Sequence, residues 1–77
     1  MTFLVIEIQT NADGAVGNFV WSYAERSLAE QKYHTVLAAA AVSALPSHAA
    51  VMLTNEGKMV DHAVYHHEVE PPEEPEE

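Results

Sequence analysis

Two short turn signals flank one long helical stretch, and this arrangement most constrains the fold of the chain. Residues 11–14 (NADG) and 55–58 (NEGK) each lie between two runs that are rich in β-branched and aromatic residues. Gly14 and Gly57 can adopt the positive φ that tight hairpin turns require, and Asn and Asp tolerate such turns. The sequence therefore predicts a hairpin, a helix and a second hairpin, in that order.

Four runs of residues predict the strands of these hairpins. They span residues 2–9, 15–23, 50–54 and 59–67, and they favour β-structure by alternation and composition. Gly17 weakens the second run and predicts a β-bulge there. The first and third runs are the most apolar, which favours central positions and the strand order 2-1-3-4. In that order every pair of neighbouring strands is antiparallel.

The central stretch predicts one helix from about residue 28 to residue 44. Ser27 followed by Glu30 matches a capping box, and Pro46 lies just beyond the expected end. The fold class is therefore α+β, ββαββ, with a four-stranded antiparallel sheet and one helix on one face. The helix positions expected to face the sheet recur at helical spacing: Ala29, Tyr33, Val36, Leu37, Ala40 and Ala44.

The net charge of −9 is distributed unevenly along the chain. Six of the twelve acidic residues lie in the last ten positions, which leaves six acids and three bases, a net charge of −3, in residues 1–67. We expect residues 1–67 to form a single domain and residues 68–77 to be a disordered acidic tail. The few, scattered basic residues argue against direct nucleic-acid binding. No apolar run is long enough to span a membrane and no signal peptide is evident, so we expect a cytoplasmic protein.

No motif in the chain predicts catalysis, a metal or a cofactor. Cysteine is absent, which excludes thiol chemistry, and no serine lies in a Gly-x-Ser-x-Gly motif. His62 and His66 would lie about 13 Å apart along a strand, too far for one zinc ion. Glu30 and His34 are one helical turn apart but lack an evident third ligand. We therefore expect a protein that is not an enzyme.

The first hairpin carries large apolar groups on both of its faces. Leu4, Ile6 and Ile8 alternate with Phe3 and Val5, and the second strand adds a row of aromatic side chains. One helix covers only one face of a sheet, and an exposed apolar face favours association. We therefore expect a homo-oligomer, formed through the uncovered sheet face or the alanine-rich helix. The expected interface residues are Phe3, Val5, Phe19 and Trp21.

A second interpretation concerns a small anionic ligand. Arg26 lies near the expected start of the helix, where backbone amides favour anions, and Lys32 would add positive charge. Tyr23 or Tyr65 could stack on a base. The alternative is that Arg26 is a surface residue paired with Glu25 or Glu30, and that the aromatic residues belong to the core or to an interface.

Residues 3–10, 29–34 and 49–57 together resemble a family of small uncharacterised proteins encoded in phages and prophages of gut Firmicutes. The resemblance covers nearly the whole expected domain and includes the acidic, proline-containing tail. It implies a phage accessory role, either in the virus particle or against the host. We expect the protein to be in the cytoplasm of the host cell during phage infection. The resemblance carries no catalytic residues.

Three roles are consistent with these expectations. In the first, a non-enzymatic oligomer sequesters a nucleotide-like signal of host immunity. The second role is a structural or assembly protein that acts only through protein–protein contacts. In the third role, the acidic tail makes the chain a nucleic-acid mimic.

Overall fold

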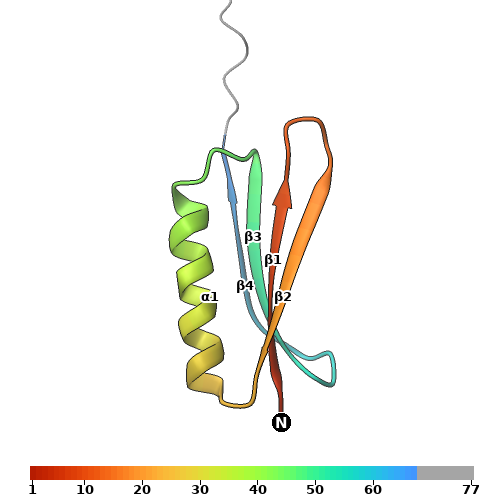
Figure 1. Ribbon diagram of the computed structural model, residues 1–77, viewed down its shortest axis with the longest axis vertical. Coiled ribbons are helices and arrows are strands. Elements are labelled where there is room, and N and C mark those ends of the chain that lie inside the picture. The colour runs from red at the N-terminus through yellow and green to blue at the C-terminus, as the bar shows by residue number, and fades with distance from the viewer. Residues whose placement is uncertain (68–77) are drawn as a thin grey trace, which may run out of the picture.

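Both turn signals form the predicted hairpins in the computed structural model, which describes residues 1–67 (Figure 1). Gly14 and Gly57 have φ angles of 92° and 87°. Asp13 Oδ1 accepts a hydrogen bond from the backbone N–H of Ala15 at 3.0 Å. These turns therefore rest on glycine conformation and local side-chain hydrogen bonds, as expected. The predicted tail, residues 68–77, lies outside the described residues.

The elements follow the predicted order: β1 (Phe3–Thr10), β2 (Val16–Tyr23), α1 (Arg26–Ala41), β3 (Ser47–Thr54) and β4 (Met59–His66). The strands form one four-stranded sheet in the order β2-β1-β3-β4, and every neighbouring pair is antiparallel. This confirms the predicted strand order. Helix α1 packs on one side of the sheet, with most of its contacts to β3 and β1 (Figure 1).

Several boundaries differ from the prediction. Helix α1 begins at Arg26, its N-cap is Glu25, and no side chain caps it. Ser27 lies inside the helix, and Glu30 instead accepts a hydrogen bond from Arg26 one turn earlier, so the capping box does not form. The helix ends at Ala41, so Ala44 lies beyond it. Gly17 pairs with Gln9 without a bulge, and the irregularity of the sheet lies next to Met52 in β3 instead.

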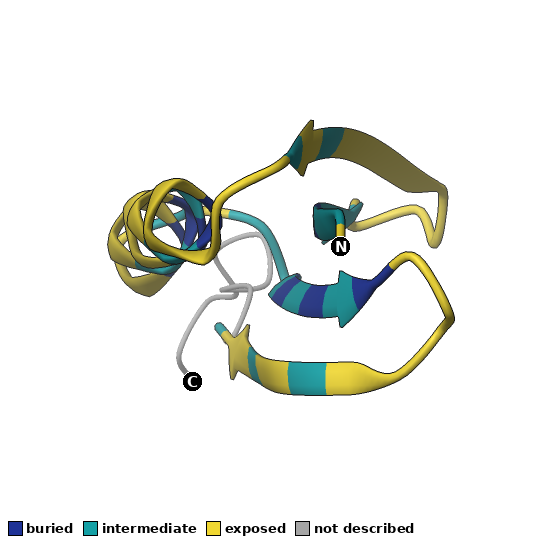
Figure 2. Cartoon of the chain, turned by 90° about the horizontal axis from the view of Figure 1, so that it is seen from below, coloured by how far each residue is buried: buried dark blue, intermediate teal, exposed yellow. Residues whose placement is uncertain are grey.

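The core lies between α1 and the sheet. Alternate residues of β3 are buried, and Met52 and Ala50 contribute to the core cluster. In Figure 2 the buried segments of α1 lie on its side toward the sheet. They include the predicted residues Ala29, Tyr33, Val36 and Ala40. Leu37 is partly buried against the same cluster. The helical spacing of apolar residues therefore identified the buried side of α1 correctly.

Tyr33 is the largest fully buried side chain. Its pKa is raised above the usual value of 10.0, first by burial and then by the negative charge and hydrogen bond of Asp61 on β4. A raised pKa means that the folded state favours the neutral phenol. This contribution to stability is present below pH 10.0 and is lost as the pH rises above that value.

The expected interface residues Phe3, Val5, Phe19 and Trp21 are on the helix side of the sheet. Val5 is completely buried, and Phe3 and Trp21 pack against the core cluster. Phe19 pairs with Glu7 on the same side, stacks next to Trp21, and is 51% exposed. This placement corrects the expectation that these four residues form the uncovered face. Both faces of β1 are apolar, and α1 covers the face that includes Val5.

Candidate functional site

We call the sheet surface that points away from α1 the open face. It consists of the residues that alternate with the buried ones along each strand. They are Leu4, Ile6, Ile8 and Thr10 of β1; Val16, Asn18, Val20 and Ser22 of β2; Ser47, Ala49, Val51 and Leu53 of β3; and Met59, His62, Val64 and His66 of β4.

Aliphatic side chains form the centre of the open face. In the register of the sheet, Ile6 lies between Val20 on β2 and Val51 on β3. The next pair along is Leu4 with Leu53, and Ala49 pairs with Val64 on the outer strand. None of the open-face residues is Asp, Glu, Lys or Arg. Within residues 1–67, the charged side chains of the strands, Glu7 and Asp61, lie on the helix side.

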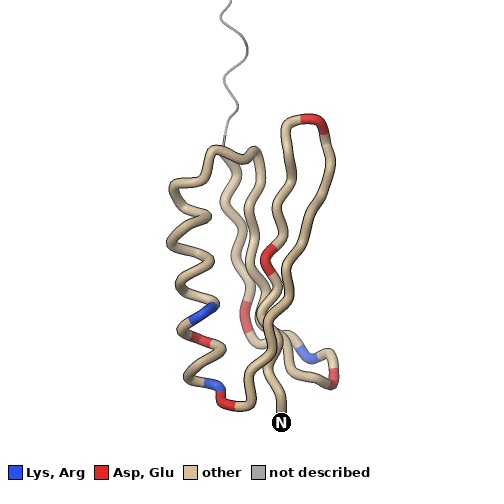
Figure 3. Tube along the Cα trace, viewed as in Figure 1, with Lys and Arg blue, Asp and Glu red and all other residues tan. Residues whose placement is uncertain are grey.

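A cleft of about 400 Å³ lies where α1 begins, at the end of the sheet that carries Phe3 and Thr54. Its apolar lining comes from Met1, Phe3, Met59 and Val60. Arg26 and Lys58 supply positive charge. Figure 3 shows that the basic residues lie toward the end of the molecule at which the helix begins.

Arg26 is held by one ion pair. Its Nε donates a hydrogen bond to Glu30 Oε2 at 2.9 Å, and the two side chains are 59% and 44% exposed. This contact is the alternative that the sequence left open for Arg26. It occupies Nε, and no acceptor among residues 1–67 contacts the two terminal guanidinium nitrogens. Arg26 therefore keeps donors for a further anion.

The structure does not bring the predicted ligand residues together. Lys32 Nζ lies 4.0 Å from the centroid of the Trp21 ring, in a cation–π contact, and does not line the cleft. Tyr23 packs against the core cluster. Tyr65 stacks on His67 near the end of β4, about 20 Å along the strand from the cleft residue Met59. Of the predicted set, Arg26 alone lines the cleft.

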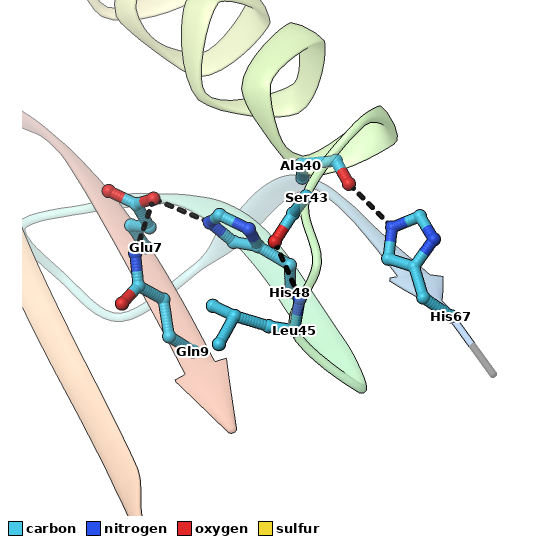
Figure 4. A network of polar contacts seen from close by, with 7 residues as sticks. All are labelled: Glu7, Gln9, Ala40, Ser43, Leu45, His48 and His67. Atoms are coloured by element: carbon cyan, nitrogen blue, oxygen red, sulfur yellow. Dashed lines mark hydrogen bonds and ion pairs between the residues drawn. The ribbon is translucent and has the colours of Figure 1, made fainter. Parts of the chain in front are cut away.

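The sequence did not identify a buried polar pair, Glu7 with His48 (Figure 4). His48 Nε2 lies 2.5 Å from Glu7 Oε2, and the side chains are only 5% and 14% exposed. Gln9 donates a second hydrogen bond to the same carboxylate at 3.1 Å. The third strand was expected to begin at residue 50, but β3 begins at Ser47, so His48 lies in the strand with its ring under the end of α1. This correction explains why the pair was missed.

The second ring nitrogen of His48 has no hydrogen-bond partner among the described residues. The favoured tautomer of His48 therefore carries its hydrogen on Nε2 and donates it to Glu7, because a hydrogen on Nδ1 would have no acceptor. Both side chains are covered by the helix and sheet, which leaves no room for a substrate at the ring. We interpret the pair as a structural contact.

A second histidine, His67, contacts the end of α1. Its Nε2 lies 2.8 Å from the carbonyl oxygen of Ala40.

Removing one partner of the pair should destabilise the fold more than removing both. For Glu7→Leu alone we expect a loss of about 1–3 kcal/mol in the free energy of unfolding, because the His48 ring is left buried without a partner. In Glu7→Leu with His48→Leu, most of that loss should be recovered. Urea denaturation of the single and double variants measures this. A double variant that is as unstable as the sum of the singles would contradict the pairing.

Two further findings concern sites and membranes. In residues 1–67 no group of three or more His, Asp or Glu side chains is placed to hold a metal ion. Helix α1 falls short of the length and apolar character needed to cross a bilayer, and it is the one helix in the described part of the chain.

No protein-family model, curated protein or solved structure matches the chain. The candidate sites are therefore argued from their geometry and chemistry.

Proposed function

We propose that the chain is a non-enzymatic binding module that acts as a homodimer assembled through the open face. The observation that carries the proposal is an aliphatic sheet surface without a charged residue. Soluble proteins normally place polar and charged side chains on the outer face of an antiparallel sheet. The chain carries Asp, Glu, Lys and Arg in its turns and helix, so their exclusion from this face is specific to it.

The area of the open face fits a small specific interface. Four strands of about 4.8 Å spacing and eight residues of about 3.3 Å rise give a flat area of about 500 Å². Two copies packed face to face would bury about 1,000 Å², which is about the smallest area expected of a biological interface. The sheets would stack about 10 Å apart, and the helices would lie on the two outer sides.

A second copy of the chain is the partner that the surface fits best. The face offers no charge pattern that would require an oppositely charged partner. Its central residues Leu4, Ile6 and Val51 can interdigitate with the same residues of another copy around a two-fold axis. Such self-complementary contact also supplies the apolar burial that a small domain lacks.

The mass of the protein in solution tests the proposal. At micromolar concentration, light scattering after size exclusion should give twice the 8.4 kDa mass of the chain. A mass equal to one chain across the micromolar range would overturn the dimer.

The proposed setting is the cytoplasm of a phage-infected host cell, and the resemblance of residues 3–10, 29–34 and 49–57 supports it. Within that setting, the open face favours a role through protein–protein contacts. Sequestration of a nucleotide-like signal is a second candidate, supported by the cleft beside Arg26. The nucleic-acid mimic depends on residues 68–77, which lie outside the described structure.

A further inference from the structure

The cleft at the start of α1 brings two basic side chains next to apolar side chains. The chain has three Lys and Arg residues in all, and two of them line this cleft. They come from different elements: Arg26 opens the helix, and Lys58 ends the β3–β4 turn. The fold therefore brings together two cations that lie far apart in the sequence.

Both cations have unused binding capacity. The Nε of Arg26 donates a hydrogen bond to Glu30, and its two terminal nitrogens form no hydrogen bond with residues 1–67. Lys58 forms no ion pair with a described residue. Its backbone is fixed, because its N–H donates to Thr54 Oγ1 at 3.2 Å and its carbonyl accepts from the Thr54 N–H at 2.8 Å. The charge of Lys58 is therefore anchored on an ordered turn beside the cleft.

The lining between the cations is apolar. Phe3 and Val60 are partly buried against the core, while Met1 and Met59 are exposed. Methionine adapts its shape to a ligand and makes favourable contacts with aromatic rings. A cavity of about 400 Å³ falls within the usual range for small-molecule sites.

We propose that this cleft binds a small organic anion, with a phosphate or carboxylate held by Arg26 and Lys58 and a flat apolar ring placed against Phe3 and Val60. Residues 1–67 carry a net charge of −3, which opposes an anion at long range. Binding therefore depends on short contacts, in which a bidentate guanidinium bond and a partly desolvated ammonium are effective. The proposal does not rest on the dimer, because the cations lie away from the open face.

Phenyl phosphate is the first probe, with inorganic phosphate and phenol as its two halves. Titration of the full chain, followed by amide chemical shifts, should show saturable binding of phenyl phosphate with changes around Phe3, Arg26 and Lys58. Each half alone should bind at least about tenfold more weakly, because each half loses one set of contacts. Benzoate and adenosine monophosphate then distinguish a carboxylate from a phosphate ligand and a small ring from a nucleotide.

Charge-removing variants test the assignment. Arg26→Gln and Lys58→Gln should each raise the dissociation constant of phenyl phosphate about tenfold. Lys32→Gln is the matched control, since it removes the third basic residue, which contacts Trp21 and not the cleft. Glu30→Gln should tighten binding, because it frees Arg26 from its ion pair. These side chains are at least partly exposed, so the variants should keep the fold, which circular dichroism verifies.

Two results would overturn the assignment. One is the absence of saturable binding of phenyl phosphate up to about 10 mM, a range that covers the weakest specific sites. The other is an equal loss of affinity in Lys32→Gln, which would show general charge attraction. A monomeric variant of the open face should still bind phenyl phosphate, so failure of the dimer and failure of the cleft give different results.

Discussion

Replacing Ile6 with lysine should convert the dimer into a monomer without unfolding the chain. Ile6 lies at the centre of the open face, between Val20 and Val51. In a sheet-on-sheet dimer its replacement would bury an unpaired ammonium group on each copy, near the two-fold axis. A buried, uncompensated charge costs about 3 kcal/mol or more, which raises the dissociation constant at least about a hundredfold. Light scattering at several concentrations measures the change in mass.

A matched control for this variant is Val42→Lys. Val42 is 84% exposed just after α1 and lies away from the open face. It changes the net charge by the same amount, so the dimer should persist. Circular dichroism should show the same helix content in both variants. If Ile6→Lys keeps the dimeric mass, the open face is not the interface.

Replacing Tyr33 with alanine should unfold a large fraction of the protein. Tyr33 is 2% exposed and packs in the same core cluster as Val5 and Met52. Removing a buried aromatic ring costs about 3–5 kcal/mol, from lost apolar burial and the cavity that remains. Domains have a free energy of unfolding of about 0.05–0.15 kcal/mol per residue, so this loss is a large fraction of the total stability of a domain of this size. Urea denaturation followed by circular dichroism measures the free energy of unfolding.

Two companion variants separate the causes. Tyr33→Phe keeps the ring and removes the hydroxyl whose pKa Asp61 raises, so its effect should stay at about 1 kcal/mol. Gln31→Ala lies on the exposed side of α1 and should change stability by less than about 0.5 kcal/mol. An unfolding curve for Tyr33→Ala that matches the parent chain would show that the sheet–helix core is not packed as described.

The strand order was predictable because the local signals were strong and consistent. Gly14 and Gly57 occupy turn positions with positive φ, which few other residues tolerate. Tyr33 and Val36 recur at helical spacing on the buried side of α1. The third strand was expected to be central because it is apolar, and its alternate burial agrees. Elements of this kind are encoded within short stretches of sequence.

The choice of the covered sheet face was not predictable by the same reasoning. Strand β1 has apolar residues on both faces, and the face that α1 covers also carries Glu7, a residue type that is rarely buried. The partner that allows Glu7 to be buried is His48, which lies before residue 50, where the third strand was expected to begin. The face could be assigned only when both side chains were known to meet. That contact spans 41 positions of the chain and depends on tertiary packing.

Of the two basic residues that line the candidate cleft, one was predicted from the sequence. Arg26 was selected from its place near the helix start, but Lys58 was seen only as part of a turn signal. The two residues meet because β3 and β4 carry the turn to the end of the sheet where α1 begins. Lys32 and Tyr65 were chosen for charge and ring chemistry, and neither property shows where a side chain lies.

The buried pair of Glu7 and His48 also has a consequence for how the strands choose their alignment. A shift of one residue between β1 and β3 would exchange the two faces of β1. Apolar burial discriminates weakly against this shift, because Leu4 and Ile6 could replace Phe3 and Val5 under the helix. The shift would, however, turn Glu7 toward the opposite surface and leave the His48 ring buried alone. The polar pair therefore selects one alignment of a sheet whose aliphatic residues would accept two.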